Sequence, residues 1–221
     1  YMPFAVLLEV ALQPCGWLAA YLGSALTSGV DISFRNLGGK ATQFLQVTPD
    51  IGTLTTIVKM TSVSQSGGMI IQHYDYEMTS KNGLVYKGNT YFGFFSKQAL
   101  ADQIGIRDVV PYQATEKEQE RAASFPYPDK APLPADMMRM VDEISLYDPE
   151  GGPNNLGLIE GKATVKEEAW FFKAHFYEDP VWPGSLGLES FMQLLKVFAW
   201  ERWKGELEIG RFSFENMALN H

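Results

Sequence analysis

The sequence predicts an α+β fold in which long apolar helices pack against antiparallel strands. Three observations lead to this prediction. A long apolar segment with helical spacing occurs near each end of the chain, at residues 4–22 and 185–204. Segments rich in Thr, Val, Ile, Tyr and Phe, separated by glycine-containing turns, lie between them. The two ends of the chain also align with each other at one constant offset, as two copies of one unit would.

The composition is that of a folded globular chain. Its 221 residues are 46% hydrophobic and 20% charged, enough for one large domain or two small ones with a sizeable core. The formal net charge of -8 argues against a nucleic-acid partner. A single cysteine excludes an intrachain disulfide, and the three histidines lack zinc-ligand spacing, so we expect no metal. A cytoplasmic location is the default expectation.

The apolar run from Pro3 to Leu22 is long enough to be considered as a membrane span. Glu9, Gln13 and Pro14 interrupt it, and it lacks the basic stretch that opens a signal peptide. We therefore expect a core helix and no membrane insertion.

The internal repeat can be read directly from the sequence. Residues 2–13 align with residues 182–193 at an offset of 180, and Pro, Leu, Glu and Gln coincide. Residues 33–36 (Ser-Phe-Arg-Asn) align with residues 213–216 (Ser-Phe-Glu-Asn) at the same offset. Identities in one order and without a gap indicate two copies of one unit.

Each copy is expected to supply one helix. The helix at 185–204 is apolar nearly all round, which is typical of a buried helix, and Gly205 is a suitable end. The helix at 4–22 is expected to end near Gly23 and to kink at Pro14.

Strands are expected between the helices. A meander of four strands is predicted at residues 40–47, 54–64, 69–79 and 84–95. Gly67-Gly68 and Asn82-Gly83 are the turn signals of its last two hairpins. Two further strands, 137–147 and 156–165, are joined across residues 148–152.

The most informative stretch is WFFKAHFYEDPVWPGSLGLE, residues 170–189. It resembles the active-site segment of the FabA-like family, the bacterial 3-hydroxydecanoyl-[acyl carrier protein] dehydratase/isomerases. The likeness extends back through residues 137–142 and forward to Gln193. The first copy resembles the family from its helix onward. Two such units in tandem resemble the dehydratase region of a polyunsaturated fatty acid synthase, which is polyketide-synthase-like.

This resemblance implies a double hotdog, in which an antiparallel sheet wraps around a central helix in each half. Residues 1–97 are the expected first hotdog, with its helix and C-terminal strands but without opening strands. Residues 98–133 are an expected linker, whose charge run at 116–121 forms a solvated face. Residues 134–221 are the expected second hotdog, with opening strands, active-site loop and central helix but without closing strands. The chain is thus expected to be truncated at both ends.

The implied reaction removes water from a (3R)-3-hydroxyacyl thioester on acyl carrier protein and yields a trans-2-enoyl thioester, in fatty acid or polyunsaturated fatty acid synthesis. Whether the product is isomerised stays open. A neutral histidine, with an ordinary pKa of about 6.5, suits abstraction of the C2 proton. A carboxylic acid in apolar surroundings can protonate the departing hydroxyl. The catalytic candidates are therefore His175, Glu9 and Glu189.

In the family, the histidine of one hotdog works with the acid on the helix of the other. Carried onto this chain, that arrangement pairs His175 with Glu9, whereas the histidine for Glu189 would fall before Tyr1. Both acids here are glutamates, whereas the acid of the dehydratase/isomerase enzymes is aspartate.

The binding candidates also follow from the resemblance. The Gly184 amide takes the oxyanion role, at a helix N-terminus whose free N–H groups and dipole favour negative charge. The Val181 carbonyl holds the histidine ring. Gln13 and Gln193, at i+4 from each glutamate, match the glutamine that contacts the acid. Phe4 occupies the position of Gly184 in the first copy, which argues against an oxyanion site there.

Other interpretations remain open. A carboxylate that activates water would make the protein a hotdog acyl thioesterase, and either copy could be a non-catalytic pseudo-dehydratase scaffold domain. Cys15 is expected to be a buried small residue, and His73 a sheet-surface residue. The aromatic residues 170–172 either line an acyl tunnel or fill the core.

No cofactor of the protein's own is expected, because the phosphopantetheine arm arrives with the substrate. The expected partners are acyl carrier protein and neighbouring synthase domains. The two hotdogs would form a pseudo-dimer, and a homodimer of the chain stays open.

Overall fold

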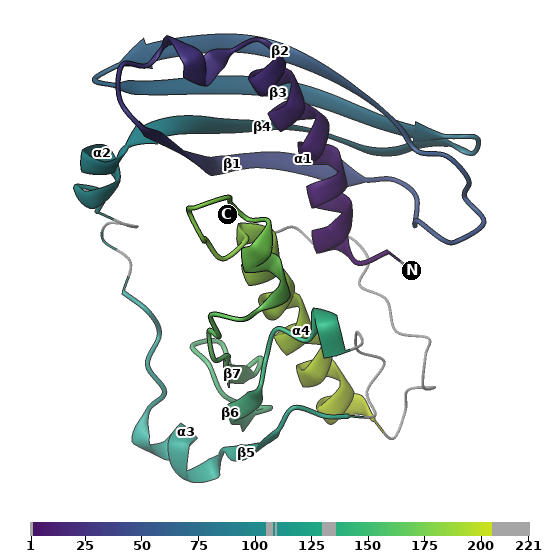
Figure 1. The fold of residues 1–221 in the computed structure, drawn as a ribbon. Coiled ribbons are helices and arrows are strands. Elements are labelled where there is room, and N and C mark those ends of the chain that lie inside the picture. Colours follow the sequence, from purple (N-terminus) through teal and green to yellow (C-terminus); the bar gives the residue numbers. More distant parts are fainter. Residues whose placement is uncertain (1, 105–107, 109, 130–135, 205–221) are drawn as a thin grey trace. The chain divides into compact units, whose positions relative to one another are not determined.

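The computed structural model describes residues 2–104, 108, 110–129 and 136–204 (Figure 1). The chain divides into two compact units, Tyr1–Arg107 and Asp108–Leu219. The predicted α+β class is confirmed, because each unit packs a long helix against an antiparallel sheet, as in a hotdog.

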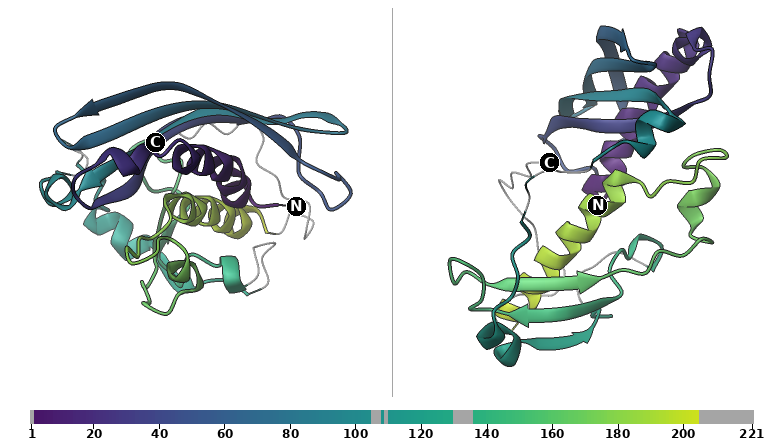
Figure 2. Two further views of the ribbon diagram at one scale, coloured as in Figure 1. Left: turned by 45° about the horizontal axis from the view of Figure 1, so that its top comes forward. Right: turned by 90° about the vertical axis from the view of Figure 1, so that its left-hand side faces the viewer.

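The first unit contains one long helix and a four-stranded sheet. The helix α1 spans Phe4–Tyr21, and the short helices η1 and α2 span Ser24–Thr27 and Lys97–Ala101. The strands are β1 (Ile32–Gln43), β2 (Thr55–Ser66), β3 (Met69–Ser80) and β4 (Gly83–Ser96). Their order in the sheet is β1-β4-β3-β2, with every neighbouring pair antiparallel. The sheet arches over α1 in the left view of Figure 2.

Small residues of α1 form the contact with this sheet. Ala11 and Cys15 are fully buried and share one core cluster with Tyr74 and Met78 of β3. Side chains alternate along β3, so that His73 is exposed between buried neighbours, as predicted. Among the described residues, α1 is the one helix long and apolar enough to cross a membrane by length and composition alone. A core helix meets the same test, and α1 packs as one.

Glycines with positive φ lie at the β2–β3 turn and directly after helix α1. The predicted β2–β3 turn is confirmed: Gly67 and Gly68 have φ of 56° and 77°, the left-handed pair that a tight two-residue hairpin requires. The helix α1 ends beside Gly23, which has φ of 70°, and it continues as one helix through Pro14.

The first strand differs from its prediction. The sequence places it at 40–47, whereas β1 spans Ile32–Gln43. Gly38 and Gly39 lower the strand propensity of this segment. In the sheet, however, a β-carbon on Gly39 would lie 2.3 Å from the backbone oxygen of Asn89, so glycine is what permits the close pairing with β4. Val47 is buried in the loop that follows.

The second unit packs helix α4 against a smaller sheet. It contains α3 (Glu116–Arg121), β5 (Ala123–Pro126), η2 (Asp136–Met138), β6 (Glu143–Asp148), β7 (Leu158–Lys162), η3 (Trp170–Lys173) and α4 (Gly184–Trp203). The sheet order is β5-β6-β7, again antiparallel. Figure 2, right, shows these strands crossing α4. Val197 of α4 is buried in a core cluster with Tyr127, Val141 and Ile144.

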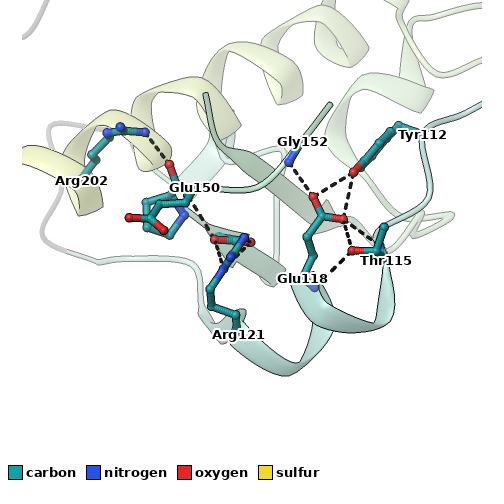
Figure 3. Close-up of polar contacts among 9 residues, drawn as sticks. Tyr112, Thr115, Glu118, Arg121, Glu150, Gly152 and Arg202 are labelled. Atoms are coloured by element: carbon teal, nitrogen blue, oxygen red, sulfur yellow. Dashed lines mark hydrogen bonds and ion pairs between the residues drawn. The ribbon is translucent and has the colours of Figure 1, made fainter. Parts of the chain in front are cut away.

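The charge run 116–121 is exposed as expected except at Glu118, for which the expectation of a solvated face is wrong. Glu118 is buried and accepts hydrogen bonds from Tyr112, Thr115 and the Gly152 backbone (Figure 3). These bonds, those from the Thr115 backbone first, lower the pKa of Glu118 to about 2. The segment therefore docks on the β6–β7 loop, and β5 after it joins the sheet.

An ion pair also anchors the same helix. The guanidinium of Arg121 donates from Nε and Nη2 to the carboxylate of buried Asp148, at 2.5–3.0 Å, and this bond is the main cause that lowers the pKa of Asp148. Sequence proximity alone could not reveal a pair 27 residues apart.

The two long helices begin alike, in agreement with the repeat. Pro3 and Pro183 precede them with the same φ of -59°, and each proline carbonyl accepts a first-turn hydrogen bond. The predicted helix 185–204 agrees with α4 to within one residue at each end. Gly205 and the repeat at 213–216 lie outside the described residues.

Candidate active site

His175 lies in the loop between η3 and α4 and is held at both its backbone and its ring. Its N–H donates to the Phe171 carbonyl at 2.9 Å, and its carbonyl accepts from the Val181 N–H at 2.9 Å. Its ring Nδ1 lies 2.8 Å from the Val181 carbonyl oxygen, which confirms the predicted contact. His175 and Val181 are therefore joined by two hydrogen bonds that fix the loop and the ring together.

The second of these bonds decides which ring nitrogen is free. A carbonyl oxygen can only accept, so Nδ1 of His175 must carry the proton. In a neutral imidazole, Nε2 then has the lone pair and can take up a proton. The half-buried ring also lies against the Phe176 ring, with ring centroids 3.8 Å apart and the planes tilted by 31°. His175 is thus prepared to act as a base through Nε2.

Helix α4 starts nine residues after this histidine. The Pro183 carbonyl accepts the first helical bonds, from Leu186 and Gly187. The amides of Gly184 and Ser185 precede these and have no partner within the helix. Gly184 is exposed, and a β-carbon there would meet no other heavy atom within 4 Å. The protein itself therefore leaves room at Gly184 for a ligand to approach the backbone closely.

The acid of the second copy is deeply buried. Glu189 is 1% exposed and Gln193 is fully buried, one turn further along α4. Gln193 Nε2 donates to Glu189 Oε1 at 3.0 Å, as the i+4 spacing predicted. The same amide donates to the Met138 carbonyl at 2.7 Å and accepts from the Met140 N–H at 2.8 Å. Gln193 therefore fixes the carboxyl group to the segment before β6.

The corresponding pair of the first copy is built differently. Glu9 is half-buried and Gln13 is exposed, and within the described chain no hydrogen bond joins them. The expectation that they repeat the Glu189–Gln193 arrangement is therefore wrong for the hydrogen bond. Phe4, at the position of Gly184, packs edge-on against Tyr86 at 5.9 Å. Its side chain occupies the place where the second copy has open space.

The second unit thus contains five of the seven predicted site residues: His175, Val181, Gly184, Glu189 and Gln193. Glu9 and Gln13 belong to the first unit. The pairing of His175 with Glu9 joins residues of separate units and stays a prediction.

The part of the chain that contains this geometry matches a known protein family. The FabA-like domain model matches residues 133–218, a range that contains the histidine loop, the start of α4 and the Glu189–Gln193 pair. Residues 133–218 are therefore similar to a FabA-like domain, which is the name used for this range below.

A curated relative extends the likeness beyond that domain. The chain is 32% identical, over 225 aligned residues, to one of the subunits of the polyunsaturated fatty acid synthase of Thraustochytrium sp.. The alignment covers 90% of this chain and 15% of that protein, so this chain spans a small part of the relative. The resemblance to a FabA-like dehydratase region is therefore confirmed.

A cavity of about 160 Å³ lies beside the active-site loop of the FabA-like domain. Phe171 and Trp182 form part of its wall, with ring centroids 4.8 Å apart, and Trp170 donates from Nε1 to the Met137 carbonyl at 3.0 Å. Phe171 is a buried core residue, whereas Trp170 is half exposed. The aromatic segment therefore contributes both to the core and to the wall of this cavity, and its role in an acyl tunnel stays a prediction.

Cys15 is a buried small residue, as predicted. Cys15 is fully buried, and this burial raises the pKa of its thiol to about 12. Within the described parts of the chain, no group of three or more His, Cys, Asp or Glu side chains could hold a metal ion.

Two polar residues of the second unit were missed by the sequence analysis. Ser185 and Tyr127 are both buried, and neither hydroxyl has a hydrogen-bond partner among the described residues. Ser185 could have been found, because it lies four residues before Glu189 in a helix. Tyr127 could not, because it is 62 positions away in sequence from that glutamate.

Proposed function

We propose that this chain carries a dehydratase site for (3R)-3-hydroxyacyl thioesters bound to acyl carrier protein, in fatty acid or polyunsaturated fatty acid synthesis. The FabA-like domain and the synthase relative support a dehydratase role in fatty acid synthesis. The observation that carries the proposal is the bond from His175 Nδ1 to the Val181 carbonyl, because it leaves Nε2 as a base.

The proposed reaction uses the histidine and a carboxylic acid. Nε2 of His175 removes the proton from C2 of the acyl chain, and the electron pair forms the C2–C3 double bond. The C3–O bond breaks, and the departing hydroxyl takes the proton of a helix glutamic acid and leaves as water. The products are the trans-2-enoyl thioester, an imidazolium and a carboxylate, so protons and charge balance.

Negative charge gathers on the thioester oxygen while the C2 proton leaves. The Gly184 amide, at the first position of α4, is the proposed donor to this oxygen. The helix dipole adds to its effect, and the open space at Gly184 permits the approach. Phe4 fills the equivalent position of the first unit, which favours one oxyanion site, in the second unit.

Glu9 is the proposed acid for His175, on the family pairing of one hotdog's histidine with the other's acid. Glu189 is the second carboxyl of the same kind, with Gln193 as its support. Isomerisation of the product is not part of the proposal.

The proposed partners follow from the substrate. The acyl chain arrives on the phosphopantetheine arm of acyl carrier protein, and the reaction needs no metal or redox cofactor. Neighbouring synthase domains are expected, because the relative is part of a synthase and this chain matches 15% of its length. We expect the protein to act in the cytoplasm.

The test compares His175→Ala, Glu9→Gln and Glu189→Gln in the full-length protein. With a 3-hydroxyacyl-carrier substrate, His175→Ala should lower enoyl-thioester formation by about 10²–10⁴-fold with unchanged thermal unfolding. Loss in Glu9→Gln but not in Glu189→Gln supports the proposed pair, and the reverse result overturns it.

A saturated acyl thioester is the matched control substrate. A dehydratase leaves it intact, whereas a hotdog thioesterase releases its thiol. Free thiol from the saturated substrate, or full turnover in His175→Ala, would contradict the proposed function.

A further inference from the structure

A row of buried polar residues runs along one side of helix α4. Ser185, Glu189 and Gln193 are spaced four residues apart, so they lie above one another on the same helix face. Their exposed fractions are 5%, 1% and 0%. The next residue of the row, Val197, is part of the apolar core. Three consecutive buried polar side chains inside an otherwise apolar packing need an explanation.

Hydrogen bonding along this row is uneven. Gln193 makes three bonds and is satisfied, whereas Glu189 has one, from Gln193. The Ser185 hydroxyl has none, although it is buried. A buried hydroxyl without a partner carries a free-energy penalty, so its retention points to a use in another state of the site.

A second hydroxyl without a partner lies in the same packing. Tyr127 is 5% exposed and contacts the core cluster that contains Val197. Its backbone N–H donates to the Asp142 carbonyl, at the end of the segment whose Met138 and Met140 hold Gln193. Burial raises the pKa of Tyr127, and the nearby charge of Glu189 raises it further. The phenol therefore lies within the electrostatic reach of that carboxyl group.

Charged groups of the surrounding segments have contacts of their own. The guanidinium of Arg139 lies over the Tyr127 ring, 5.5 Å from its centroid, and partly opposes the rise in its pKa. The Asp142 carboxylate accepts from the Thr164 N–H at 2.7 Å. His175, in the loop before α4, is bound to Val181. The hydroxyls of Ser185 and Tyr127 are the buried donors of this unit that have no partner among the described residues.

We propose that Ser185 and Tyr127 are positioning residues that donate hydrogen bonds to Glu189 when its carboxyl group is ionised. Ser185 is one turn away, within the reach of an i,i+4 pair. A carboxylate in an apolar interior needs several donors, and Gln193 supplies only one. This rests on the proposed function and deepens it, since it concerns the second of that function's two carboxyl groups: once Glu189 has lost its proton, the two hydroxyls stabilise the anion.

The test measures Glu189 directly, without turnover. In the full-length protein, the infrared band of the protonated Glu189 carboxyl is identified by its loss in Glu189→Gln, and it is followed against pH. Tyr127→Phe and Ser185→Ala should each move the pH at which this band disappears upward by about one unit, because a donor to the anion is lost. Both variants remove a hydroxyl that has no partner, so their thermal unfolding should match that of the parent.

Tyr86→Phe is the matched control, because the Tyr86 hydroxyl is also buried but belongs to the first unit. It should leave the band unchanged. An unmoved band in both Tyr127→Phe and Ser185→Ala overturns the proposal, as does an equal shift in Tyr86→Phe. Failure of the dehydratase assay alone would not affect this result, so the two proposals fail separately.

Discussion

Helices α1 and α4 start at equivalent positions of the repeat but bury opposite faces over their middle turns. In α1, Ala11 and Cys15 are buried under the sheet, while Gln13 and Trp17 are exposed. In α4 the equivalents of the exposed pair, Gln193 and Val197, are fully buried. Conversely, Phe191 and Leu195, which correspond to Ala11 and Cys15, are exposed.

The difference follows from which strands each helix meets. The helix α1 packs against β1–β4, which come after it in the chain, whereas α4 packs against β5–β7, which come before it. The two related helices therefore pack through different faces. In α4, Glu189 and Gln193 lie on the face that packs against the part of the chain before the helix. This explains why the same Glu-x-x-x-Gln spacing gives a buried, bonded pair in one unit and a looser pair in the other.

The largest expected loss of activity comes from replacing Gly184, the first residue of α4, by phenylalanine, which is the residue at the equivalent position of α1. Gly184→Phe should lower dehydration by about 10²–10³-fold, because the side chain blocks approach to the amide donor. Folding should be unaffected, since no atom lies within 4 Å of the new β-carbon position. Steady-state kinetics and thermal unfolding measure the two effects, and full activity would remove Gly184 from the site.

The next effect distinguishes the two glutamines. Gln193→Ala should lower the free energy of unfolding by about 3 kcal/mol, because it leaves the Met140 N–H and the Met138 carbonyl without their partner. Gln13→Ala, at the exposed equivalent, should change it by less than about 0.5 kcal/mol. Urea denaturation of both variants measures this contrast. Equal losses would contradict the assignment of opposite faces.

A smaller effect concerns acid stability of the second unit. The folded-state pKa of Glu118, about 2, lies below its ordinary value of 4.5. A lowered folded-state pKa contributes stability that is present above pH 4.5 and is lost as the pH falls toward 2. Glu118→Gln should flatten this loss in pH-dependent urea denaturation. Glu120→Gln, on the exposed side of the same helix, is the control and should leave the acid limb unchanged.

Local patterns were enough to predict much of this molecule. The apolar residues of 185–204 predicted α4 to within one residue at each end, and Gly67-Gly68 predicted the turn between β2 and β3. The Glu189–Gln193 bond was predictable for the same reason, because helix geometry alone sets an i+4 distance.

Features that depend on distant partners were not predictable. The sequence predicts a solvated charge at Glu118, because the Gly152 N–H that donates to its carboxylate lies 34 residues away. The early start of β1 depends on how closely the β4 backbone approaches Gly39. The main-chain groups of Met138 and Met140 that hold Gln193 carry no side-chain signal at all.

The attachment of Gln193 to that segment has one more consequence. Met137 and Met140 line the cavity beside the active-site loop, and Met138 and Met140 are the groups that hold the Gln193 amide. The orientation of the Glu189 carboxyl and the shape of this cavity are therefore set by the same short stretch of backbone. A change in packing on the cavity side is transmitted, through a single amide group, to the direction in which the acid points.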